Sequence, residues 1–140
     1  MTRRALNIAL HWSFALVLLA MIKGGSDAVW LRWVFVALGA AWVGIAVLKG
    51  VLAKPGPKLT GFLRDRFTAL HIGLYALITL SVVINALALL GLAPKDMAFT
   101  SLLFVLAAAT FHALFHIWRH CALYDNALRM IFPKSWHKYL

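Results

Sequence analysis

The chain has 140 residues, 64% of them apolar, with 14 basic against four acidic side chains and a mean hydropathy of +0.87. This composition excludes a water-soluble domain and predicts an integral membrane protein. Since all four acidic residues are Asp and none is Glu, di-iron carboxylate sites and paired-carboxylate acid–base chemistry are excluded as well.

The first predicted membrane span runs from about residue 5 to 22, after the basic pair Arg3 and Arg4. A basic start before an apolar run is also typical of a signal peptide. We expect a span instead, because no convincing cleavage motif follows and because the segment carries His11.

The second predicted span covers residues 29–53, and two prolines just after it predict its end. Trp30 and Trp33 stand where an interfacial aromatic belt is expected, and Arg32 can extend its guanidinium to the headgroups. Residues 54–66 form the longest predicted loop.

The third and fourth predicted spans cover residues 67–92 and 98–122. Each predicted span is long enough to cross a hydrocarbon core of about 30 Å. Residues 123–140 mix apolar and basic side chains, which predicts a short tail at the membrane interface. We therefore expect an all-α, integral membrane four-helix bundle that forms a single domain over residues 1–140.

Most basic residues fall on the side of the bundle that carries both termini: Arg3, Arg4, Lys49, Lys54, Lys58, Arg64, Arg66, Arg119, Arg129, Lys134 and Lys138. Only Lys23, Arg32 and Lys95 fall on the other side. By the positive-inside rule, both termini are expected in the cytoplasm. The charge therefore matches a lipid bilayer as partner and argues against nucleic acid.

Cys121 is the single cysteine. An intrachain disulfide, a thiolate iron–sulfur cluster and a CxxCH haem attachment are therefore excluded.

The six histidines all fall in the predicted cytoplasmic half or in the tail: His11, His71, His112, His116, His120 and His137. Those of the fourth span are spaced four residues apart and form one stripe on the helix. The one-sided distribution predicts a single site near the cytoplasmic face.

His11 and His112 are each seven residues from a basic residue, Arg4 and Arg119 respectively. In antiparallel helices this spacing places both imidazoles at one depth, about 10 Å from the same membrane face. Buried ionisable groups are functional by default, and two facing neutral imidazoles suit the axial positions of a haem iron. We expect His11 and His112 to be the iron ligands.

Other side chains near this pair suit a haem. Four aromatic residues could wall a macrocycle: Trp12, Phe14, Phe111 and Phe115. Four arginines could receive its propionates: Arg4, Arg64, Arg66 and Arg119. Aromatic residues at helical spacing are more often plain packing, and arginines at a cytoplasmic rim need no further explanation. For a single intramembrane histidine, the alternative is a hydrogen bond to a neighbouring helix, worth about 0.6 kcal/mol. Zinc is the other use of clustered histidines, but the Cys or carboxylate ligands that usually help to hold it are missing from the buried region.

Three segments resemble the bacterial cytochrome b561 family. Residues 6–12 (LNIALHW) are similar to the start of its first span, and residues 71–75 (HIGLY) to its third. The most specific segment is His112 to Met130, with Asp125 thirteen residues after His112. The resemblance implies a four-helix cytochrome of the bacterial inner membrane, with b haems, electron exchange with quinone, and His11 and His112 as ligands of the cytoplasmic-side haem.

The family's second haem takes its ligands from positions that here hold Phe35 and Ala98, neither of which binds iron. We therefore expect one haem b, and single-electron transfer to or from ubiquinone or another quinone, or within a larger redox complex or a homodimer. His71, His116 or Asn85 could donate a hydrogen bond to a quinone carbonyl. We favour an electron-transfer protein over a stand-alone oxidoreductase.

Two alternatives remain open. One is a haem-poor structural or accessory subunit of a respiratory or photosynthetic complex, which suits a small chain with short outer turns. The other is a superoxide:quinone oxidoreductase, which a basic funnel on the outer face would support.

Overall fold

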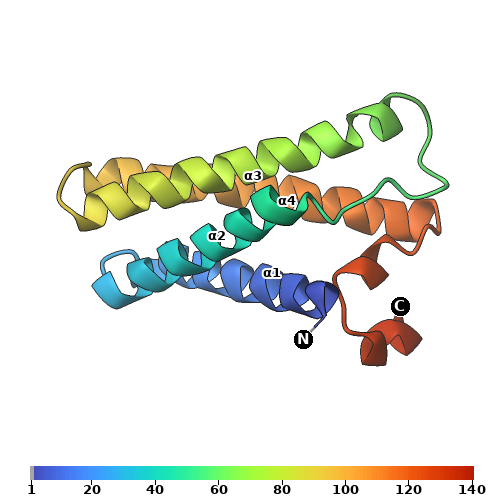
Figure 1. Ribbon diagram of the computed structural model, residues 1–140, viewed down its shortest axis with the longest axis horizontal. Coiled ribbons are helices and arrows are strands. Elements are labelled where there is room, and N and C mark those ends of the chain that lie inside the picture. The colour runs from blue at the N-terminus through green and yellow to red at the C-terminus, as the bar shows by residue number, and fades with distance from the viewer. Residues whose placement is uncertain (1) are drawn as a thin grey trace.

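The computed structural model describes residues 2–140, which form four long helices and three short helical segments without any strand. The long helices are α1 (Arg3–Ala20), α2 (Val29–Lys49), α3 (Gly61–Leu89) and α4 (Lys95–Ala122). They run up and down as a bundle, with both termini and the α2–α3 connection at one end (Figure 1). We call this the basic end, after its charge, and the other the opposite end.

All four helices in the described residues are long and apolar enough to cross a membrane. Their outer surfaces carry large apolar side chains that are mostly exposed, for example Leu48, Phe104 and Phe111. Soluble monomers rarely expose so much contiguous apolar surface, whereas lipid covers it without cost. The chain is therefore a multi-pass membrane protein with the expected all-α four-helix architecture.

Local sequence explains where α1 begins and ends. The Thr2 hydroxyl accepts a hydrogen bond from the Ala5 N–H at 3.2 Å and caps the first turn. The α-helix continues from Ala20 into a π-helical segment, Met21–Gly25, in which Gly24 has a φ of 126°. Because only glycine adopts this conformation easily, the chain turns here toward α2.

The other helices differ from the predicted spans at their ends. α2 ends at Lys49, four residues before the expected end, because Gly50 has a left-handed φ of 74°. α3 begins at Gly61 instead of residue 67, and α4 at Lys95 instead of residue 98. Hydropathy marks only the apolar part of a helix, whereas backbone hydrogen bonding continues into polar residues at the membrane surface.

The apolar core fills the middle of the bundle and its opposite end with side chains from all four helices: Phe14, Leu18, Met21, Leu31, Phe35, Trp42, Ile78, Val82, Leu102 and Val105. Within it the rings of Phe14 and Phe35 pack with centroids 4.9 Å apart. α1 and α4 pack against each other only loosely, while α2 and α4 both pack closely on α3.

Gly39 allows α2 to approach its neighbours closely. A Cβ at this position would collide with the Val82 side chain and lie 3.0 Å from the Phe14 ring. Gly39→Ala is therefore expected to lower the free energy of unfolding by about 1–3 kcal/mol through overpacking. Gly44→Ala is the matched control, because a Cβ there meets nothing within 4 Å in residues 2–140, and we expect it to be neutral or stabilising. Thermal unfolding in detergent compares the two variants, and equal midpoints would contradict the packing argument.

The tail folds back onto the start of α1. It contains two short 3-10 segments, Ala127–Met130 and Lys134–Tyr139. The Trp12 indole N–H donates to the Ile131 carbonyl at 2.9 Å, and the Arg4 guanidinium donates to two tail carbonyls at 2.7 and 3.1 Å. These hydrogen bonds fix the tail at the basic end of the bundle.

Candidate functional site

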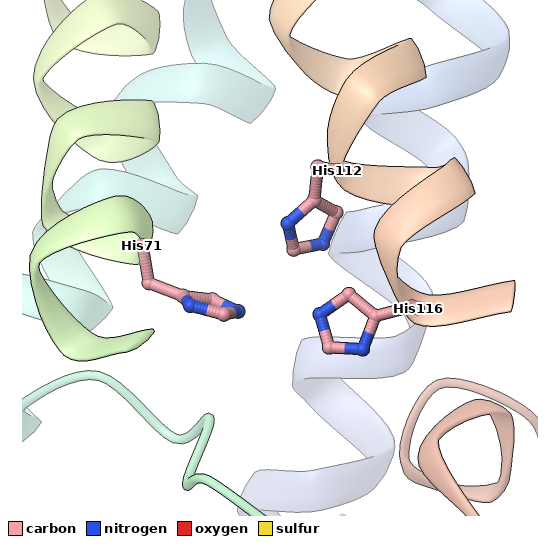
Figure 2. Close-up of side chains that lie close together, drawn as sticks. All are labelled: His71, His112 and His116. Atoms are coloured by element: carbon pink, nitrogen blue, oxygen red, sulfur yellow. The ribbon is translucent and has the colours of Figure 1, made fainter. Parts of the chain in front are cut away.

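Three imidazoles from two neighbouring helices point toward one another in the basic half of the bundle (Figure 2). His71 comes from α3, and His112 and His116 come from successive turns of α4. One ring nitrogen of each lies within 4.8 Å of the others. The ring centroids are 5.0 Å apart for His71 and His112, 5.5 Å for His71 and His116, and 4.5 Å for His112 and His116. Neutral imidazoles placed in this way could jointly bind a metal ion.

His71 is the most firmly oriented of the three. Its ring is 6% exposed, and its Nδ1–H donates to the Phe67 carbonyl one turn earlier at 2.8 Å. Because the carbonyl can only accept, Nδ1 carries the proton and the lone pair lies on Nε2. Metal-ligating histidines usually have their second nitrogen held in this way, so the hydrogen bond prepares His71 as a ligand.

His11 lies beside this cluster on α1. Its ring is half-buried and packs edge-on against Trp12 and Trp42, with centroids 5.4 and 5.5 Å away. The Trp42 indole N–H in turn donates to the Asn7 side chain at 2.9 Å. The buried Nδ1 of His11 has no hydrogen-bond partner in the described part of the chain. Buried polar atoms normally have partners, so this nitrogen is available to a ligand.

His116, like His11, has a buried ring nitrogen without a hydrogen-bond partner. In His116 this atom is Nε2, and no group of residues 2–140 bonds to it. Of the four candidate histidines, His71, His112 and His116 are therefore brought together, and His11 faces Trp42. The expected pairing of His11 with His112 stays a prediction.

An apolar groove of about 150 Å³ opens beside the cluster, between α3 and α4. His71 and His112 contribute its polar edge, and Phe111 and Phe115 line it from α4. Of the expected aromatic wall, Trp12 instead packs at 5.2 Å on Phe132 of the tail, and Phe14 belongs to the apolar core.

Arg119 forms a buried ion pair with Asp125 at the basic end. The Arg119 Nε and Nη2 atoms donate to one carboxylate oxygen at 2.8 and 2.5 Å, and the two side chains are 3% and 0% exposed. The guanidinium also lies over the rings of Phe67 and Phe115, 5.0 and 5.8 Å from their centroids. Arg119 is thus engaged by protein groups, and its expected role with a propionate stays a prediction.

The other predicted basic residues also contact protein. Arg4 holds the tail, and one of its nitrogens lies 3.3 Å from the His137 ring nitrogen. Arg64 donates to two carbonyls of the preceding loop at 3.1 and 3.3 Å, and Arg66 lies over the Phe62 ring. These contacts account for each side chain without a cofactor.

The opposite half of the bundle is closely packed. Phe35 and Ala98 are both fully buried. Next to them the Asn85 amide donates to the Ser81 carbonyl at 2.9 Å and to the Ser101 hydroxyl at 3.2 Å. Asn85 is 0% exposed and its amide nitrogen links α3 to α4, while its buried Oδ1 has no hydrogen-bond partner in the described residues. Its expected contact with a quinone stays a prediction.

Two site residues, Phe67 and Trp42, were missed by sequence reasoning, and the pairing of Asp125 with Arg119 was not predicted. Phe67 orients His71, and its position four residues before His71 was the available signal. Asp125 is one of only two acidic residues near the basic end, which could have suggested a pairing with Arg119.

Comparison with protein-family models, with curated proteins and with solved structures gives no match.

Proposed function

We propose that the protein is a membrane b-type cytochrome that binds one haem between its helices in the basic half and transfers single electrons. The observation that carries this proposal is the convergence of three histidines from α3 and α4, together with the buried ring nitrogens of His11 and His116 that have no partner within residues 2–140. An intramembrane imidazole without a partner is costly, so the arrangement favours a bound group. When bound, haem supplies a one-electron iron couple.

His112 is the central ligand candidate. It faces His71 and His116 directly, and the family resemblance pairs it with His11. His71 competes with His11 for the second axial position, because its Nδ1–H is already held and its Nε2 is free. A haem held by two histidines would leave the other two imidazoles of these four free of the iron.

The groove beside the cluster is small for a porphyrin. Its volume of about 150 Å³ is below the ~300–1,000 Å³ of typical pockets for drug-sized ligands. The donor atoms fit a haem iron, but uptake requires the helices around the cluster to move apart. α1 packs only loosely on α4, so the helices that carry His11 and His112 could separate, whereas α3 and α4 pack closely at the three-histidine cluster.

The proposed partners follow from the same location. Of the imidazoles that do not bind iron, His116 could donate a hydrogen bond to a quinone that approaches from the lipid, because the N–H of neutral His71 is already held by the Phe67 carbonyl. The basic end would face the cytoplasm of a bacterial inner membrane. A larger redox complex or a second copy could supply or accept the electron.

A reduced-minus-oxidised absorption spectrum of protein purified from native-like membranes tests the proposal. We expect b-type bands and about one haem per chain by pyridine haemochrome. Only one histidine cluster exists, and the opposite half is filled by Phe35 and its neighbours in the described residues. Protein that has neither these bands nor the capacity to take up added haemin would refute the proposal.

A bare transition-metal ion is the second candidate, and the mutual approach of three imidazoles favours it. Three histidines with a fourth, exchangeable position are typical of zinc and other first-row ions. Such an ion needs no additional room in the groove. Elemental analysis of the same preparation separates the candidates: iron in a 1:1 ratio with haemochrome supports haem, and haem-free zinc or copper supports the ion.

Two further alternatives predict different results. A haem-poor accessory subunit would purify without cofactor while remaining bound to larger membrane subunits. A superoxide:quinone oxidoreductase would reduce quinone in the presence of superoxide as a pure protein.

A further inference from the structure

A second pocket, lined in part by polar and charged side chains, lies at the opposite end of the bundle, far from the histidines. It has a volume of about 150 Å³ and lies between the α1–α2 turn, the end of α3 and the start of α4. Its polar lining consists of Ser26, Asp27, Arg32 and Lys95. Neither the histidine cluster nor electron transfer explains it.

Arg32 is the principal residue of this pocket. Arg32 is 4% exposed, and its Nη2 donates a hydrogen bond to the Ser26 carbonyl at 2.6 Å. Its Nε is buried and lacks any hydrogen-bond partner over residues 2–140. A buried guanidinium that is always charged requires a counter-ion, and no carboxylate in the described chain lies within ion-pair distance of it.

Two helix N-termini border the same pocket. Val29 and Lys95 are the first residues of α2 and α4, and both line the cavity. Neither helix has a side-chain cap within the part of the chain that the structure describes. Uncapped N–H groups and the positive ends of both helix dipoles favour an anion here.

We propose that this pocket binds a phosphate oxyanion, with Arg32 as its bidentate ligand and Lys95 as a second cation at the mouth. Guanidinium geometry matches two phosphate oxygens, and a single phosphate group suits the size of the pocket. The exposed Trp30 and Trp33 of α2 place the pocket at the level of the lipid headgroups. A phospholipid phosphodiester and free inorganic phosphate share the chemistry required.

The test uses the whole chain, delipidated in a phosphorus-free maltoside detergent. Thermal unfolding is measured with inorganic phosphate, with a short-chain phosphatidylglycerol, and with a monoacylglycerol that has no phosphate. We expect a higher midpoint with a phosphate compound and no shift with the monoacylglycerol. A shift with phosphatidylglycerol alone identifies the lipid as the source, and a shift with inorganic phosphate alone identifies the free ion. No shift with either phosphate compound would overturn the proposal.

Variants assign the effect to this pocket. Arg32→Gln is expected to weaken phosphate binding at least about tenfold, since a charge-assisted hydrogen bond is worth more than a factor of ten. Lys95→Gln should weaken phosphate binding by a smaller factor. This variant still tests the proposal if Arg32→Gln does not fold. Lys23→Gln is the matched control, because it removes a cation at the same end outside the pocket lining. Equal binding by the wild-type protein and the Lys95 or Arg32 variants would contradict the assignment.

A variant of Asp27 tests whether the counter-ion of Arg32 is a bound phosphate or the Asp27 carboxylate. It lines the pocket but is exposed and forms no ion pair in residues 2–140. Because its charge opposes a bound anion, Asp27→Asn is expected to strengthen phosphate binding without lowering stability. If Asp27→Asn destabilises the protein and neither phosphate compound raises the unfolding midpoint of the wild-type protein, Asp27 is the partner of Arg32 and the proposal is wrong.

Discussion

Replacing His112 by alanine is expected to abolish the b-type absorption spectrum of the purified protein. His112 belongs to every ligand pair that we consider: it lies 5.0 Å from His71 between ring centroids, and the family resemblance pairs it with His11. Without this imidazole, the proposed haem would lose one of the two side chains that would hold its iron. The reduced-minus-oxidised spectrum and the haemochrome content, measured per chain, give the result.

The matched control is His120→Ala. His120 lies two turns further along α4 and is not part of the three-histidine cluster. Its variant should keep a full haem content, which shows that the loss in the His112 variant is specific. A normal spectrum from His112→Ala would mean that the ligands are misassigned.

The same measurement on two further variants identifies the second ligand. If His11 binds the iron, His11→Ala loses the haem and His71→Ala keeps it with an altered spectrum. If His71 binds it, the two results are reversed. Full retention by both variants would mean that neither His11 nor His71 is required to hold the haem, and a loss of zinc or copper instead of haem would favour the bare metal ion.

The number of helices and their order were predictable because hydropathy alone marks a membrane span. The ends were not, because Gly50 ends α2 through its left-handed backbone while α3 begins before its apolar part. Such effects depend on local conformation and on polar helical residues, and hydropathy is insensitive to both. The predicted start of α2 and end of α4 match the helices, whereas the other predicted span ends are displaced by two to six residues.

The sequence predicts the depth of the histidines but not the direction of their rings. His11 and His112 are each seven residues from a basic residue, which predicts one depth for both. Which neighbour each ring faces depends on how each helix is rotated about its own axis, and that is set by packing. Close packing of α3 on α4 brings His71 to His112, whereas Trp42 covers His11. Only the pairing of His112 with His116 follows from sequence, because they are one helical turn apart.

Asp125→Ala is expected to lower the free energy of unfolding by about 3–5 kcal/mol, because it leaves the buried Arg119 guanidinium without its partner. Asp65→Ala is the matched control: Asp65 is an exposed carboxylate on α3 near the same end, and its loss should change stability by less than about 0.5 kcal/mol. Denaturant unfolding in detergent compares them. Replacing Arg119 and Asp125 together by Met and Leu should recover part of the loss, since no buried charge then remains. Equal stability of the two single variants would show that the pair contributes nothing.

The effect of Asp125→Ala should extend to the histidine site. Arg119 lies over the Phe67 ring, and the Phe67 carbonyl holds the Nδ1–H of His71 at 2.8 Å. When Asp125 no longer holds the guanidinium, the contact that fixes the start of α3 against the end of α4 weakens. If His71 contributes to cofactor binding, Asp125→Ala therefore reduces haem retention during purification, while Asp65→Ala does not. If His11 and His112 alone hold the iron, the Asp125 variant loses stability and keeps its haem.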